Sequence, residues 1–170
     1  GVMARQANGS VVVRHGKTMI LATATADLSK LDPEQFPLLV DYREKMSAAG
    51  RIPGNFFRRE MRPSDQETLT SRLIDRSIRP LFPKGFKYPV TVTATVYSAD
   101  PTSDLMGLAI LGASTALGLS DIPFNGPISE CRVARIDGSF IINPSSEALK
   151  NADIDLMVGA SADSVAMVEG

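Results

Sequence analysis

Cysteine and histidine are almost absent from this 170-residue chain, which contains one residue of each. The single cysteine, Cys131, excludes an internal disulfide and any metal site built from several thiolates, and it favours a reducing compartment. The single histidine, His15, lies in a predicted turn, and no neighbouring serine, cysteine or acid suggests a catalytic triad. We therefore predict that His15 is an exposed turn residue and that the chain holds no zinc site.

The sequence motifs of several enzyme classes are missing too. The chain has no Walker loop, no GxGxxG after a predicted strand, and neither an HExxH nor an HxE…CxxC zinc motif. Asp153 and Asp155 would share a strand face, but their position favours a strand-entry pair over a metal clamp. The residues by themselves therefore predict no catalytic acid or base and no metal ligands.

Long apolar runs and an extreme net charge are absent as well. The longest apolar stretch, 105–119, is interrupted by three glycines, so we expect no membrane span. The net charge is −1, which means that any nucleic-acid binding must be local. The chain shows neither an initiating methionine nor a natural tail, and we expect residues 1–170 to be one domain cut from a longer protein.

Arginine is concentrated in one segment, residues 50–83. This segment carries seven of the 12 arginines, four acidic residues and no lysine, so its net charge is +3. Guanidinium groups grip phosphate through two oxygens at a time and stay charged at any physiological pH. The segment is therefore the candidate anion-binding site.

The second half of this segment predicts a helix over residues 64–79. Ser64 and Glu67 have capping-box spacing, and Pro80 closes the helix. Leucine and isoleucine share one face, at Leu69, Leu73, Ile74 and Ile78, so we expect Leu69 to be buried and Leu69→Asp to prevent folding. A second face carries Arg72, Arg76 and Arg79. A stripe of this kind also occurs on salt-bridged or solvated faces, and that alternative stays open.

The first half of the segment predicts a loop with paired aromatic and cationic residues, Phe56, Phe57, Arg58 and Arg59. Aromatic rings can stack on unpaired bases while neighbouring arginines hold the backbone, which is how single strands are bound without sequence readout. The alternative is that the two phenylalanines anchor the loop to the core.

The remaining pattern predicts an α+β fold with a mixed sheet. Alternating β-rich runs indicate strands over 10–13, 18–26, 36–42, 90–98, 131–136, 140–142, 154–160 and 165–169. A helix rich in small residues is expected over 105–119, with Asp104 as its cap, and a short helix is expected before Asn151. Asp137 and Gly138 form a strong hairpin signal.

Several long runs carry a resemblance to a known family. They are AAGRIPGNFFRRE (48–60), RPSDQETLTSRLIDRSIRPLFPKGF (62–86) and LGLSDIPFNGPI (117–128), supported by VDYREKM, ATATA, DGSFIINP and IDLMVGASADSVAMVEG. The chain resembles, nearly end to end, the first of the two ribonuclease PH-like core domains of polynucleotide phosphorylases. The resemblance implies a ribosomal-protein-S5-domain-2-like βαβα core and a ring-shaped homotrimer. It also implies processive 3′-to-5′ phosphorolysis of RNA, in which inorganic phosphate releases nucleoside diphosphates.

The resemblance also assigns roles to residues. Phe56, Phe57, Arg58 and Arg59 match the loop that narrows the channel and grips single-stranded RNA, and Arg62, Arg72 and Arg76 match arginines that face phosphate or the RNA backbone. Catalytic and metal-binding residues, with Mg²⁺, are expected in the second core domain, which lies outside this sequence. This segment alone is therefore expected to be inactive. For the whole protein, the resemblance implies a cytoplasmic mRNA-degrading enzyme that can have RNA-degradosome partners. The open alternatives are a noncatalytic RNA-binding ring subunit of exosome type and a small-molecule phosphate-binding domain.

Overall fold

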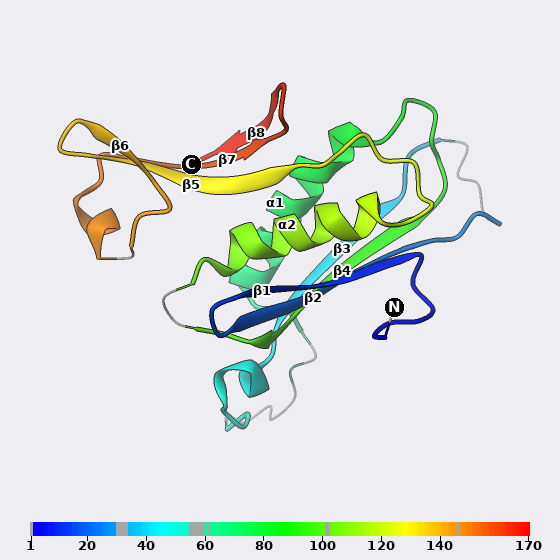
Figure 1. The fold of residues 1–170 in the computed structure, drawn as a ribbon, viewed down its shortest axis with the longest axis horizontal. Coiled ribbons are helices and arrows are strands. Elements are labelled where there is room, and N and C mark those ends of the chain that lie inside the picture. Colours follow the sequence, from blue (N-terminus) through cyan, green and yellow to red (C-terminus); the bar gives the residue numbers. More distant parts are fainter. Residues whose placement is uncertain (1, 30–33, 55–59, 61, 101–102, 146) are drawn as a thin grey trace.

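The protein is built from two four-stranded sheets with two helices between them (Figure 1). The computed structural model describes residues 2–29, 34–54, 60, 62–100, 103–145 and 147–170. The helices are α1 (Asp65–Ile78) and α2 (Leu105–Gly118), and short 3-10 helices occur at Met46–Ala49, Arg79–Leu81 and Ala148–Asn151. The helices lie between the sheets because each has apolar or small residues on more than one face.

The first sheet is mixed and has the strand order β1-β2-β4-β3. Its strands are β1 (Gly9–His15), β2 (Thr18–Ala26), β3 (Leu38–Glu44) and β4 (Val90–Ser98). β1, β2 and β4 pair antiparallel, whereas β3 runs parallel to β4 along the edge. The prediction of a mixed sheet is confirmed, and so is the hairpin in which Gly16 takes a φ of 58° and His15 is exposed.

α2 packs closely on the first sheet because its helix face is made of small residues. Ala109, Ala113 and Ala116 are fully buried against the alternating Ile, Ala and Val residues of β2 and β4. A Cβ added to Gly112 would come within 3.0 Å of the Cβ of Ala22, so only glycine fits at this contact without a shift. The predicted cap is confirmed, since Asp104 accepts hydrogen bonds from the backbone N–H groups of the first turn.

The orientation of α1 differs from the prediction. Leu69 is 50% exposed, and the buried row consists of Thr70, Ser77, Ile74 and Ile78. The prediction that Leu69 is buried is therefore wrong, and the reason for expecting Leu69→Asp to prevent folding no longer holds. The predicted buried face of α1 differs from the observed one by a rotation of about one residue, because the prediction counted only leucine and isoleucine as core residues. A helix between two sheets also buries small polar side chains, because they allow close approach, as Ser77 does beside Gly159.

The second sheet is antiparallel and has the order β6-β5-β7-β8. Its strands are β5 (Ser129–Ile136), β6 (Ser139–Ile142), β7 (Ile154–Ala160) and β8 (Val165–Glu169). The predicted turn is confirmed, with φ values of 49° at Asp137 and 77° at Gly138. This sheet contacts α2 through β5 and α1 through β8. Residues of these helices line both cavities described below.

Asp153 and Asp155 pair with arginines of the neighbouring strand. Arg132 binds Asp155 through two nitrogens, at 2.7 and 2.6 Å, and Arg135 binds Asp153 in the same way. These cross-strand pairs hold the pKa values of both carboxyls below their ordinary range, chiefly through the hydrogen bonds from the guanidinium groups. The prediction that these aspartates form a strand-entry pair is confirmed, because β7 begins at Ile154, between them.

Candidate nucleic-acid interface

The predicted RNA-binding residues fall into two groups. Phe56, Phe57, Arg58 and Arg59 lie outside the described residues, so their contacts stay a prediction. Arg62, Arg72 and Arg76 are described, and all three are exposed. Arg62 precedes α1, and the other two lie on its outer face.

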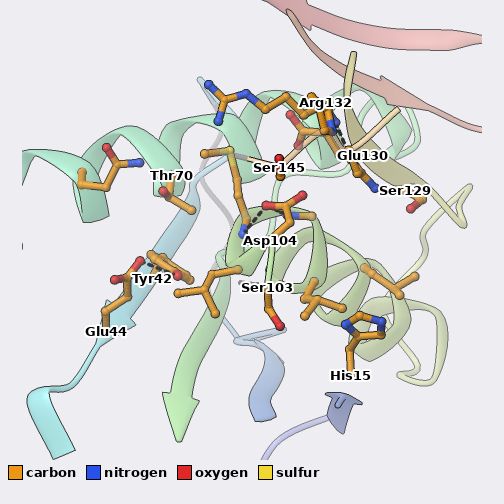
Figure 2. A pocket seen from close by; sticks show the side chains of 18 of the residues that line it. His15, Tyr42, Glu44, Thr70, Ser103, Asp104, Ser129, Glu130, Arg132 and Ser145 are labelled. Atoms are coloured by element: carbon orange, nitrogen blue, oxygen red, sulfur yellow. Dashed lines mark hydrogen bonds between the residues drawn. The ribbon is translucent and has the colours of Figure 1, made fainter. Parts of the chain in front are cut away.

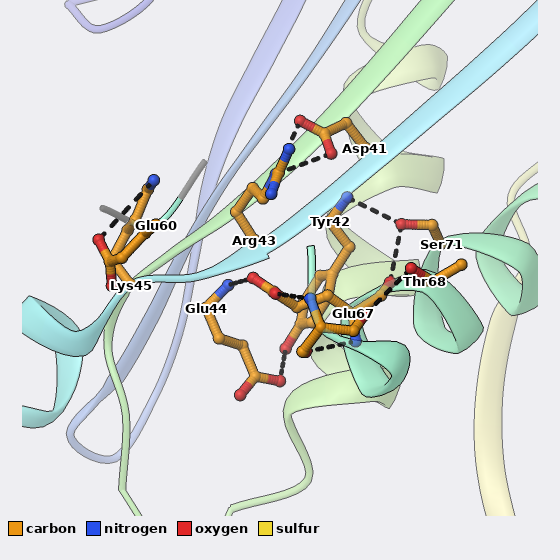
Figure 3. Close-up of polar contacts among 10 residues, drawn as sticks. Asp41, Tyr42, Arg43, Glu44, Lys45, Glu60, Glu67, Thr68 and Ser71 are labelled. Atoms are coloured by element: carbon orange, nitrogen blue, oxygen red, sulfur yellow. Dashed lines mark hydrogen bonds and ion pairs between the residues drawn. The ribbon is translucent and has the colours of Figure 1, made fainter. Parts of the chain in front are cut away.

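A capping box fixes where α1 begins and therefore where its arginines point. The hydroxyl of Ser64 accepts a hydrogen bond from the backbone N–H of Glu67, and the carboxylate of Glu67 accepts one from the backbone N–H of Ser64 at 2.6 Å. Its other oxygen accepts from the backbone N–H of Glu44, at the end of β3, at 2.9 Å (Figure 3). Partial burial opposes ionisation of Glu67, but these N–H donors outweigh it and lower the pKa of the carboxyl.

A groove of about 370 Å³ lies between the outer face of α1 and β3. It is lined by Leu38, Val40, Thr68, Ser71, Arg72, Asp75, Arg76 and Arg79. Ser71 joins its two walls, because its hydroxyl accepts from the backbone N–H of Tyr42 and donates to the carbonyl oxygen of Glu67 (Figure 3). The groove therefore carries three arginines, and its two walls, α1 and β3, are joined by a hydrogen bond through Ser71.

The three arginines of this groove are not equally available. Arg79 is committed to the fold: it binds both carboxylate oxygens of Asp75, donates to the carbonyl oxygens of Phe36 and Leu38, and lies 5.6 Å from the centre of the Phe36 ring. Arg76 forms an exposed ion pair with Glu169 of β8. The salt-bridged alternative considered for this stripe therefore holds for two of its three members.

Arg72 is the available member. Within the part of the chain that the structure describes, its exposed guanidinium group has neither an ion-pair nor a hydrogen-bond partner. An exposed, uncompensated guanidinium group beside a groove suits a phosphate oxygen. Arg76 can bind the same ligand only if the ligand displaces Glu169. This surface therefore offers one available cation, Arg72, and one, Arg76, for which a ligand must compete with Glu169.

Sequence reasoning missed a second cavity, of about 710 Å³, between the two helices and the second sheet. Figure 2 shows Asp104 among the side chains that line it, with Glu130 and Arg132 on one side and Tyr42 and Glu44 on another. Burial, and after it the hydrogen bond that Tyr42 donates to Glu44 at 2.7 Å, raises the pKa of the Tyr42 hydroxyl.

Glu130 is the unusual residue of this cavity. It is 5% exposed, and burial followed by the negative charges of Asp104 and Glu169 raises its pKa to about 7. The sequence did contain a signal for Glu130, because extending the predicted strand 131–136 by one residue places this acid at an inward-facing position. It was not recognised because the predicted strand began after Glu130.

Comparison with known proteins identifies the family. Residues 1–123 match the model of the "3′ exoribonuclease family, domain 1", and residues 126–170 match the model of its domain 2. The chain belongs to the 3′ exoribonuclease family. The boundary between the two matches lies in the connector after α2, so each match contains one of the two sheets.

Two curated relatives of this 3′ exoribonuclease family chain carry the same name. A polyribonucleotide nucleotidyltransferase of Nitratidesulfovibrio vulgaris (strain DP4) is 55% identical over 100% of the chain, and one of Staphylococcus saprophyticus is 53% identical over 99%. The chain spans only 22% and 24% of the lengths of these relatives. The family resemblance inferred from the sequence motifs is confirmed.

A solved structure supports the fold. A chain of the Archaeoglobus fulgidus exosome with RNA bound to the active site matches with a TM-score of 0.66 and 16% identity, covering 99% of this chain and 74% of that one. At this identity the likeness concerns the fold alone, and it confirms the predicted ribonuclease PH-like α+β architecture. Among the described helices of this exoribonuclease family chain, none combines the length and the apolar character needed to cross a bilayer.

Proposed function

We propose that residues 1–170 form one domain, the RNA-gripping first core domain of a polynucleotide phosphorylase that degrades mRNA from the 3′ end. The observation that carries the proposal is the identity of more than half of the residues, over the whole chain, to relatives named polyribonucleotide nucleotidyltransferase. In the proposed reaction, inorganic phosphate attacks the terminal phosphodiester and a nucleoside diphosphate leaves.

The proposed role of this domain is to hold the RNA backbone. Arg72 supplies a guanidinium group that has no partner among the described residues, and Arg76 supplies an exchangeable one. Arg62 lies just before the start of the same helix. Phe56 and Phe57 are proposed to stack on bases while Arg58 and Arg59 bind phosphates. Such contacts suit a strand that is moved through the protein, because they do not depend on base identity.

Catalysis is proposed to take place elsewhere in the longer chain. The second core domain would bind Mg²⁺ and inorganic phosphate, and three copies would form a ring around a central channel. Cytoplasmic location and binding to other RNA-degradosome proteins complete the proposal. In the described part of this chain, no three His, Cys, Asp or Glu side chains gather as a metal-binding group.

One experiment with the complete gene product tests the function. Poly(A) is incubated with and without inorganic phosphate, and adenosine diphosphate is measured by chromatography. Release that requires phosphate is expected. RNA binding without any phosphate-dependent release would instead favour the noncatalytic exosome-type subunit. Arg72→Ala should lower the affinity for RNA, whereas Arg135→Ala, which removes an arginine of the second sheet, serves as the matched control.

A further inference from the structure

The cavity between the helices and the second sheet is acidic at its inner end. Asp104 enters it from the start of α2, and Glu130 enters it from β5. The cation nearest in sequence, Arg132, is committed to Asp155 through two hydrogen bonds. His15 also lines the cavity, from the β1–β2 turn, and Figure 2 shows it at a distance from Glu130.

Glu130 lacks any internal compensation for its charge. Both of its carboxylate oxygens are buried, and neither has a hydrogen-bond partner among the described residues. A buried ionised carboxylate without partners costs several kcal/mol, so native proteins almost always supply a hydrogen bond, a counter-ion or a metal. Its carboxylate neighbours, Asp104 and Glu169, add repulsion. A positively charged ligand would remove both penalties.

The Asp104 carboxylate and the main chain of Glu130 both lie close to Gly107, which has no side chain to separate them. A Cβ at this residue would lie 2.7 Å from Oδ2 of Asp104 and 3.1 Å from the main-chain carbonyl oxygen of Glu130. The other oxygen of Asp104, Oδ1, already accepts from the N–H groups of Met106 and Gly107, so Oδ2 is the oxygen left to face this space. Two oxygens from different elements therefore lie next to Gly107, and the second of them belongs to the residue whose carboxylate has no partner among the described residues.

We propose that this end of the cavity is a divalent-cation site, with the Asp104 carboxylate, the Glu130 carboxylate and the Glu130 carbonyl oxygen as ligands. Hard oxygen donors of this kind suit Mg²⁺ or Mn²⁺, which are held by one or two carboxylates and complete their shell with water. Two carboxylates supply two negative charges, which exceeds the roughly half positive charge at the start of α2. The proposed ligands are distinct from the residues proposed to bind RNA, although the charge of Glu169, the partner of Arg76, also acts on Glu130.

The test uses the 170-residue chain with Mn²⁺ and Mg²⁺ as probes. In ¹⁵N-labelled protein, Mn²⁺ should broaden the amide signals of Met106, Gly107 and Glu130 first, because paramagnetic broadening falls steeply with distance. Either metal should also raise the unfolding temperature relative to NaCl of equal ionic strength, as ligands of the native state do.

Three variants separate the ligands from the fold. Glu130→Gln removes a charge without changing shape, Asp104→Asn keeps a capping side chain, and Gly107→Ala fills the space between the oxygens while leaving both charges. Each should weaken Mn²⁺ binding at least tenfold. Asp163→Asn, which removes an exposed carboxylate from the β7–β8 turn, is the matched control and should bind Mn²⁺ as the unmodified chain does.

Two results would overturn the proposal. Equal Mn²⁺ responses in the unmodified chain and in Glu130→Gln would show that any metal binds elsewhere. Unfolding temperatures that depend on pH but not on either metal would show that a proton, and not a cation, satisfies Glu130. Neither result touches the proposed function, because RNA and phosphate take no part in the measurement.

Discussion

Replacing Glu169 by glutamine should strengthen RNA binding, because it releases Arg76. Glu169 holds Arg76 in an ion pair whose side chains are 43% and 50% exposed. An RNA phosphate that uses Arg76 must first displace this carboxylate. Glu169→Gln removes that competition and leaves the side-chain shape almost unchanged.

The expected gain follows from the exposure of the pair. Exposed ion pairs contribute about 0.2–1 kcal/mol, and about 1.4 kcal/mol corresponds to a tenfold change in affinity. Glu169→Gln should therefore tighten binding by roughly 1.4-fold to fivefold, and the stability of the fold should fall by no more than about 1 kcal/mol. Arg76→Ala should weaken binding, and it should reduce the slope of log affinity against log salt by about 0.7.

The assay is fluorescence anisotropy of a labelled oligoadenylate at several salt concentrations. The matched control is Asp153→Asn, which makes the same change in net charge and frees a different arginine, Arg135, on the second sheet. An equal gain in Asp153→Asn would mean that net charge explains the effect. A gain from Glu169→Gln that persists in an Arg76→Ala background would refute the proposed exchange, because the two changes must then act independently.

Three further outcomes can be measured. In the complete protein, Arg58→Ala with Arg59→Ala should lower the salt slope of RNA binding by about 0.7 for each lost phosphate contact, and an unchanged slope would contradict the gripping role. Ile74→Ala should destabilise the fold by about 2–5 kcal/mol in urea denaturation, whereas Leu69→Ala should cost about 0.5 kcal/mol, and equal losses would contradict the observed orientation of α1. Because the folded-state pKa of Glu67 is lowered, its contribution to stability is present above the ordinary pKa of 4.5 and is lost as the pH falls below it. Glu67→Gln should therefore flatten the acid limb of the stability–pH curve, and an unaltered limb would show that other carboxyls control it.

Periodicity predicted the central strands β2 and β4 well because one face of each is buried. In β2 and β4, residues such as Ile20, Val92 and Ala94 alternate with exposed or half-exposed neighbours, and that alternation is visible in the sequence. The turn at Asp137 and Gly138 was predictable for a local reason, since few residues adopt positive φ. The strands and hairpins of the second sheet were predicted, but a separate second sheet was not, because the partition of strands between sheets depends on contacts between distant segments.

The candidate site was less predictable than the fold. The availability of an arginine depends on partners far away in sequence: Arg76 meets Glu169, 93 positions later, and Arg79 reaches the carbonyl oxygens of Phe36 and Leu38. The isolation of Glu130 likewise appears only when all neighbouring elements are in place. Sequence spacing identifies which charges lie on one face, and only the packed structure shows which of them are neutralised.

The two hydrogen bonds accepted by Glu67 have a mechanical consequence. One oxygen accepts a hydrogen bond from the N–H of Glu44 and the other accepts one from the N–H of Ser64. A single carboxylate therefore links the end of β3 to the start of α1. Met46 is fastened in the same region by Glu60. The end of β3 and the start of α1 are therefore held to each other directly, and not only through the chain that connects them.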